Sequence, residues 1–143
     1  MSLILPDFYL GSEFESRSLY NTVNIVINAA REVVHPQIQN LTVLNLNWDD
    51  IPQQNININN TLFRVIDIID TYLQNGQKVL VNCFAGVSRS STIVIAYLMY
   101  RYSLLLEEAF RFVKSKRIII QPNAGFIAQL KHLEPLLLTY KKK

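Results

Sequence analysis

Apolar and polar residues follow one another along this chain in short blocks that predict alternating strands and helices. Three apolar blocks have the length and composition of buried strands: residues 23–28, 42–48 and 78–82. A shorter block at residues 7–10 predicts a fourth strand, which ends at Gly11. Ser12 then stands as a candidate N-cap for a helical turn over residues 12–19.

Helical periodicity is clearest between residues 59 and 75. Apolar side chains recur there at helical spacing on one face, and Gly76 follows as a stop signal. We therefore predict an amphipathic helix that packs against the sheet. Its polar side chains are expected to face away from the core: Arg64, Asp67, Asp70 and Gln74.

The second half of the chain predicts further helices. One begins at about Ser90 and has almost no polar face between residues 93 and 100, so we expect it to be buried. Amphipathic patterns predict another helix over residues 106–117 and a last one that includes residues 126–137. Pro135 lies inside the last pattern, and we expect it to kink or shorten that helix.

Short strands that alternate with helices predict an α/β fold, with a central mixed, mostly parallel sheet flanked by helices. No internal repeat or long linker divides the chain, so we expect one small domain over residues 1–140 and a basic tail at residues 141–143. Ligands bind such sheets beyond the carboxyl ends of the strands. Cys83 follows the strand at residues 78–82 and is predicted to lie at that place.

Composition narrows the function classes further. The formal net charge is +3, which the three terminal lysines alone account for, so we expect a solvated tail and neither nucleic-acid nor membrane binding. No apolar run approaches the ~18–20 residues of a membrane span, and the first residues do not resemble a signal peptide. The single cysteine cannot form an internal disulfide, which suits the cytoplasm or nucleus.

The loop from Cys83 to Arg89 carries the chemistry. Its backbone amides can surround a tetrahedral phosphate, helped by the start of the following helix and by the planar guanidinium of Arg89. The same features stabilise a thiolate at Cys83, the reactive form of the nucleophile. Gly86 allows the backbone to bend closely. We predict that the phosphate-binding residues are Phe84, Ala85, Gly86, Val87, Ser88 and Arg89.

The segment NCFAGVSRSST at residues 82–92 closely resembles the signature loop of the dual-specificity protein phosphatases, a branch of the cysteine-dependent protein tyrosine phosphatases. Other segments resemble landmarks of that family in the same order, over nearly the whole chain: DFYLGSE at 7–13, VINAARE at 26–32, QNI at 54–56, AYLMYR at 96–101, EEAFRFVKSKR at 107–117 and QPNAGFIAQL at 121–130. The resemblance implies a small, single-domain form of the protein tyrosine phosphatase fold.

The resemblance also implies roles for individual residues. Cys83 would attack phosphorus, Arg89 would hold the phosphoryl oxygens, and Ser90 would help the sulfur leave when the intermediate is hydrolysed. An aspartic acid would protonate the leaving group. Asp49 and Asp50 compete for that role, and the spacing from Asp50 to the QN-apolar element that follows favours Asp50.

Two further positions, Asn123 and Asn82, are expected to support the site. Asn123 resembles a family residue that braces the active-site loops, although a purely structural turn at residues 122–123 would also explain it. The family usually has His immediately before the nucleophile, where this chain has Asn82. An amide can donate a hydrogen bond but cannot carry a charge, so we expect Asn82→His to raise activity at mildly acidic pH.

The predicted activity is hydrolysis of phosphotyrosine and phosphoserine or phosphothreonine in proteins, by a monomer that needs no cofactor and no metal. His35 is expected to be a surface or packing residue, because no second ligand lies at metal-binding spacing from it. Two alternatives stay open. One is a pseudophosphatase that binds phosphorylated proteins without turnover, and the other is a phosphatase for non-protein phosphate esters.

Overall fold

The computed structural model describes residues 1–140, and the basic tail predicted at residues 141–143 lies outside them. Five strands form one sheet in the order β1-β2-β5-β3-β4. β1 runs antiparallel to β2, whereas all other neighbours run parallel, so the sheet is mixed and mostly parallel as predicted. The strands are β1 (Ser2–Leu5), β2 (Phe8–Gly11), β3 (Ile25–Ala30), β4 (Thr42–Trp48) and β5 (Val79–Asn82).

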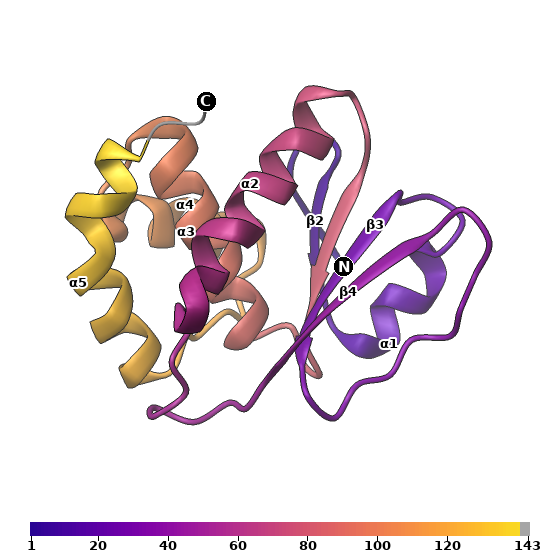
Figure 1. Cartoon of the computed structure of the whole chain (residues 1–143), viewed down its shortest axis with the longest axis horizontal. Coiled ribbons are helices and arrows are strands. Elements are labelled where there is room, and N and C mark those ends of the chain that lie inside the picture. Colours follow the sequence, from indigo (N-terminus) through magenta and orange to yellow (C-terminus); the bar gives the residue numbers. More distant parts are fainter. Residues whose placement is uncertain (141–143) are drawn as a thin grey trace.

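Helices cover the sheet unequally. Four of them gather on one side and the short α1 lies on the other (Figure 1). α3 is the buried centre of the larger layer and packs against α2, α4 and α5, which agrees with the apolar sequence that predicts it. The helices are α1 (Glu13–Ser16), α2 (Thr61–Gln74), α3 (Arg89–Tyr102), α4 (Leu106–Lys116) and α5 (Ala124–Thr139). Two 3-10 turns complete them, Arg17–Leu19 and Ile58–Asn60.

The bounds of β2 and β5 differ from the prediction by one residue, and two strands differ more. β3 begins at Ile25 and ends at Ala30, each two residues later than expected, and Asn24 bridges to Lys78 through its side chain and backbone. β1 has no counterpart in the prediction. It is a four-residue strand that pairs only with β2, and a turn with Asp7 at φ +68° connects the two strands.

One side-chain prediction in the helices is wrong, and the last helix is not shortened. Asp70 is 3% exposed rather than solvent-facing, because the Tyr97 hydroxyl of α3 donates a hydrogen bond of 2.7 Å to its carboxylate. Pro135 does not shorten α5, which continues to Thr139. Leu133 and Leu137 are buried on either side of the proline, and this burial offsets the loss of one backbone donor.

The arrangement of the sheet brings the site together. In the register of the parallel strands, Gly11 and Asn28 both pair with Asn82, so β2, β3 and β5 end at the same edge. The segments that follow these strands and β4 therefore meet there. They are α1, the loop after β3, the Cys83 loop and the loop that carries Asp49 and Asp50.

Candidate active site

Cys83 lies directly after β5, at the carboxyl edge of the sheet. Its side chain is 2% exposed, and its Sγ lies 3.1 Å from the hydroxyl oxygen of Ser90. The loop turns between β5 and α3 with Gly86 at φ +68°, a conformation that residues with a Cβ rarely adopt. A Cβ at Gly86 would also lie 2.7 Å from the backbone carbon of Gly11, so the glycine is required for two reasons.

Arg89 is the first residue of α3 and points back across the carboxyl edge. Its Nη1 donates to Glu32 Oε1 at 2.7 Å and its Nη2 donates to Glu32 Oε2 at 2.6 Å. Nη1 also donates to the backbone oxygen of Trp48 at 3.0 Å. Among the described residues, the buried Nε of Arg89 has no acceptor. The guanidinium is thus fixed from one end, and of its five N–H donors the one on Nε and the second one on Nη2 remain for a ligand.

The charges around Arg89 reinforce one another. The hydrogen bonds to Glu32 raise the pKa of Arg89, and the nearby charges of Cys83 and Asp50 act in the same direction. The same hydrogen bonds lower the pKa of Glu32 below its usual value. The pair therefore favours the charged form of both partners, Arg89 as a cation and Glu32 as an anion.

The two candidate acids have different partners. Asp50 accepts a hydrogen bond of 2.9 Å from the Asn123 side chain, and its charge acts on Arg89. Asp49 instead accepts a hydrogen bond of 2.9 Å from Nε of Arg31. Asp50 therefore faces the Cys83 loop and the start of α5, whereas Asp49 belongs to an ion pair at the surface.

Asn123 lies between the two loops. Its backbone N–H donates to the Ser88 hydroxyl at 2.9 Å, and its Nδ2 donates to Asp50. Its Oδ1 caps α5 by accepting from the backbone N–H of Phe126. Gly125 lies in the first turn of α5, close to the loop that carries Asp49, Asp50 and Pro52, which we call the acid loop. A Cβ at Gly125 would be 2.1 Å from the Pro52 oxygen. The start of α5 therefore sets the position of the acid loop.

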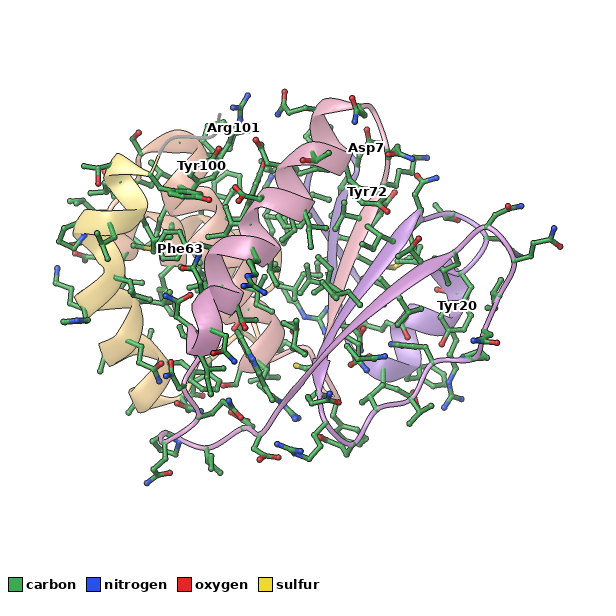
Figure 2. All side chains as sticks on the ribbon, viewed as in Figure 1. Asp7, Tyr20, Phe63, Tyr72, Tyr100 and Arg101 are labelled. Carbon is green, nitrogen blue, oxygen red and sulfur yellow. The ribbon has the colours of Figure 1, made fainter. Side chains whose placement is uncertain are left out.

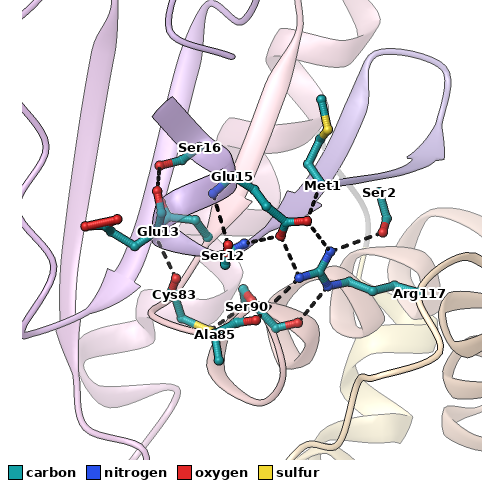
Figure 3. A network of polar contacts seen from close by, with 12 residues as sticks. Met1, Ser2, Ser12, Glu13, Glu15, Ser16, Cys83, Ala85, Ser90 and Arg117 are labelled. Atoms are coloured by element: carbon teal, nitrogen blue, oxygen red, sulfur yellow. Dashed lines mark hydrogen bonds and ion pairs between the residues drawn. The ribbon is translucent and has the colours of Figure 1, made fainter. Parts of the chain in front are cut away.

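Arg117 holds the Cys83 loop from the other side (Figure 3). Its Nε donates to the Gly86 carbonyl at 2.9 Å, and its Nη2 donates to Glu15 Oε1 at 2.7 Å. Burial alone would raise the pKa of Glu15, but hydrogen bonds from Arg117, the N-terminal amine and the Ser12 backbone lower it to about 2. Glu15 also closes the capping box with Ser12, so α1 and the end of α4 are joined through this pair.

Comparisons with known proteins agree with this geometry. The family model of the dual specificity phosphatase catalytic domain matches residues 8–135. The chain belongs to this family. It is 38% identical over 148 residues to a protein phosphatase Slingshot homolog from Xenopus laevis, covering 99% of this chain but 21% of that relative. A putative tyrosine phosphatase, 123R, from Invertebrate iridescent virus 6 is 48% identical over 106 residues, which cover 68% of this chain and 74% of the relative.

A solved structure extends the comparison to the fold. The crystal structure of human DUSP28 superimposes on this dual specificity phosphatase domain with a TM-score of 0.87. The match covers 96% of this chain and 97% of that chain, at 29% sequence identity. The predicted fold class is therefore confirmed. None of the helices in residues 1–140 is long and apolar enough to cross a membrane.

Two residues of this dual specificity phosphatase site were missed by the sequence reasoning as members of the site. In the sequence, Glu32 belongs to the segment VINAARE that resembles a family landmark, and Arg117 belongs to the basic end of a predicted helix. Glu32 follows β3, the strand next to β5, and an acidic residue after a neighbouring strand is a signal that could have been used. Arg117 lies 31 residues from Gly86, and no spacing rule would have paired them.

His35 packs against the Tyr20 ring, as expected of a packing residue, and also makes a polar contact that the sequence does not indicate. It is half-buried, and its Nε2 lies 2.9 Å from the side-chain oxygen of Asn82. Asn82 is fully buried and directs its Nδ2 towards the Cys83 carbonyl and the Asn28 side chain, each at 3.4 Å. Asn82, which directly precedes Cys83, is thus part of a polar network with His35 and Asn28.

Proposed function

We propose that this domain hydrolyses phosphate monoesters on proteins, at phosphotyrosine and at phosphoserine or phosphothreonine, through a phosphocysteine intermediate. The observation that carries the proposal is the convergence on one loop of Cys83, a rigidly held Arg89 and, from the facing loop, Asp50. Membership of the dual specificity phosphatase family supports it. These three residues and Ser90 act in two steps.

In the first step, the Cys83 thiolate attacks phosphorus while the bond between phosphorus and the leaving oxygen breaks. The protonated Asp50 carboxyl gives its proton to that oxygen, so a neutral hydroxyl group departs. The amides of residues 84–89 hold the phosphoryl oxygens, and Arg89 offers them the Nε–H and the second N–H of Nη2. Glu32 keeps this edge of the guanidinium aimed by binding one N–H of each Nη atom.

In the second step, water attacks phosphorus and the sulfur–phosphorus bond breaks. Asp50, now a carboxylate, accepts a proton from the water, and inorganic phosphate leaves. The Ser90 hydroxyl, 3.1 Å from Sγ, donates a hydrogen bond to the departing thiolate. All the charge that develops is met by side chains and backbone amides of this chain, and the cycle returns Asp50 to its protonated form.

Hydrolysis of an aryl phosphate and of phosphopeptides by the purified domain tests the proposal. We expect turnover by the unchanged domain and none by Cys83→Ser. Absence of turnover, together with Arg89-dependent binding of vanadate or a phosphopeptide, would support a binding module instead. Phosphotyrosine, phosphoserine and phosphothreonine peptides of one sequence would resolve the preference among the three.

We also propose a compartment and an oligomeric state for the domain. A single cysteine that must stay a thiol to react suits a reducing compartment such as the cytoplasm or nucleus. We further propose that the domain acts as a monomer on phosphorylated proteins. Size-exclusion chromatography with light scattering at micromolar concentration tests whether the domain is a monomer, and the mass of a dimer would contradict the proposal.

A further inference from the structure

A continuous chain of hydrogen bonds runs from Tyr20 to the backbone of the proposed nucleophile. The Tyr20 hydroxyl lies 2.6 Å from Nδ1 of His35, and Nε2 of His35 lies 2.9 Å from Oδ1 of Asn82. Nδ2 of Asn82 then donates to the Cys83 carbonyl at 3.4 Å. Tyr20 follows the turn after α1 and lies beside that helix (Figure 2). Three segments far apart in sequence therefore meet behind the phosphate-binding loop.

The backbone around Asn28 fixes the direction of the hydrogen bond between His35 and Asn82. The Asn28 side-chain oxygen accepts from the backbone N–H of Ala30 at 3.2 Å, and its Nδ2 donates to the Val33 carbonyl at 2.7 Å. Asn82 can therefore present only its NH₂ group to Asn28 Oδ1, which leaves its oxygen facing His35. Because that oxygen can only accept, Nε2 of His35 must carry a proton.

We propose that His35 is a positioning residue for the Cys83 loop: by donating to Asn82, it holds the Asn82 amide against the Cys83 carbonyl. This proposal rests on the proposed function, because it assigns a part of the same site. The carbonyl that Asn82 holds belongs to the residue that carries the sulfur. When it is held, the Cys83 peptide keeps its orientation and the following amides keep pointing at the thiolate and the phosphate.

The burial of Asn82 indicates why His35 is needed to hold its amide. Asn82 is 0% exposed, so water cannot take over the hydrogen bond that His35 supplies. Without His35, the Asn82 oxygen would be a buried acceptor with no partner, and the amide would be free to rotate away from Cys83. Its own two donor contacts are long, at 3.4 Å each, and would not hold it alone.

His35 itself is reached from solvent through a cleft of about 500 Å³, lined also by Gln37, Leu41 and Asn45. The groups around His35 that carry or can acquire charge are few. The Tyr20 hydroxyl contacts His35 directly, and the Arg17 guanidinium, in the turn before Tyr20, interacts with Tyr20 electrostatically. Arg31 and Glu32 precede it in its own loop, but each is paired with another residue of the site. Either protonation state of His35 can donate from Nε2.

Two substitutions of His35 separate positioning from packing. His35→Phe keeps a ring against Tyr20, whose ring centroid lies 5.6 Å away, but removes the donor. His35→Gln removes the ring but keeps an N–H donor. His132→Phe, at the exposed histidine on α5, is the matched control. The rate of Cys83 alkylation by iodoacetamide is measured against pH for each, together with kcat/KM for an aryl phosphate.

We expect His35→Phe to move the midpoint of alkylation upward by about one pH unit, and to lower kcat/KM about tenfold, the effect of one hydrogen bond. His35→Gln should keep the alkylation midpoint and kcat/KM close to those of the unchanged domain, and His132→Phe should change neither quantity. Equal losses in the Phe and Gln variants, or an unchanged alkylation profile in both, would overturn the proposal. If His35→Phe does not fold, His35→Leu, which also lacks a donor, takes its place: an upward shift that His35→Gln does not show supports the proposal, and a profile like that of the unchanged domain overturns it.

The alkylation measurement needs no turnover. A domain that fails to hydrolyse any phosphate, but whose alkylation profile depends on the His35 donor, would contradict the proposed function and leave the positioning role supported. A domain that hydrolyses phosphate with a profile independent of His35 would give the opposite result. The two failures are therefore distinguishable.

Discussion

Both carboxylate oxygens of Glu32 bind the guanidinium of Arg89, at 2.7 and 2.6 Å, across 57 residues of sequence. The Arg89 side chain is 8% exposed, whereas the Glu32 side chain is 51% exposed. The acid therefore reaches in from the surface to hold a buried cation. This contact determines which guanidinium edge a phosphate can meet, and it makes Glu32 a candidate for substitution that leaves the core intact.

Replacing Glu32 should impair the site without unfolding the domain. In Glu32→Gln the amide NH₂ would face one Nη of Arg89, so one of the two hydrogen bonds is lost and the guanidinium can rotate. We expect kcat/KM for an aryl phosphate to fall by about 10–100-fold, the effect of losing a charge-assisted hydrogen bond. Glu13→Gln, which breaks the surface pair with Arg17, is the control and should leave kcat/KM unchanged. An effect of equal size in the control would contradict the assignment.

The choice between the two acids can be tested with leaving groups of different basicity. Asp50→Asn should lower kcat by about 100-fold or more for phenyl phosphate, because a poor leaving group needs the proton. The loss should be smaller for p-nitrophenyl phosphate, whose leaving group is stable without it. Asp49→Asn removes only the pair with Arg31 and should change kcat little. If only Asp49→Asn shows the dependence on leaving group, the assignment to Asp50 is wrong.

Gly125 offers a way to move the acid loop without touching the acid. A Cβ at this position would lie 2.1 Å from the Pro52 oxygen and 2.4 Å from its Cα, and neither backbone atom can move alone. We expect Gly125→Ala to lower kcat about tenfold or more, since small displacements of a catalytic group are costly. Vanadate binding to the Cys83 loop should change much less. Ala124→Ser, at the exposed neighbour, is the control, and an equal loss of vanadate affinity and kcat would refute this explanation.

Stability in acid should depend on Glu15. Its pKa is about 2 in the folded domain, against an ordinary value of 4.5, so folding favours the charged form. The resulting stabilisation is complete above about pH 5 and is lost as the pH falls towards 2. Because the side chain is partly exposed, we expect Glu15→Gln to lower the free energy of unfolding by on the order of 1–2 kcal/mol at pH 7, and by much less at pH 3. Urea unfolding at both pH values measures this, and an equal loss at both would contradict it.

Much of the fold could be predicted because the signals are local. The spacing from Cys83 to Arg89, the central Gly86 and the apolar helix that follows lie within one stretch of sequence. β4 is found with the predicted bounds, since its apolar run is bounded by polar loops. β1 was missed because a four-residue strand at an edge has too few buried positions to show a pattern.

The missing parts of the site are contacts between segments. Asp70 sits on the polar side of a helical pattern, yet Tyr97 of the neighbouring helix supplies a partner that makes its burial tolerable. His35 has no ligand-like neighbour in sequence, and its relation to Asn82 exists only because β3 and β5 are adjacent in the sheet. Patterns of one segment cannot show which polar groups two segments will share.

The attachment of the Cys83 loop to later residues has a consequence for how the domain is made. The Val87 carbonyl accepts from the backbone N–H of Gln121, Ser88 binds Asn123, and Gly86 binds Arg117. A nascent chain that has emerged only as far as α4 already contains the nucleophile and the phosphate clamp, but none of these three bonds. The catalytic reactivity of Cys83 should therefore appear only after residues 117–123 have been made, and a ribosome-bound fragment that ends before residue 117 should display a thiol of ordinary reactivity.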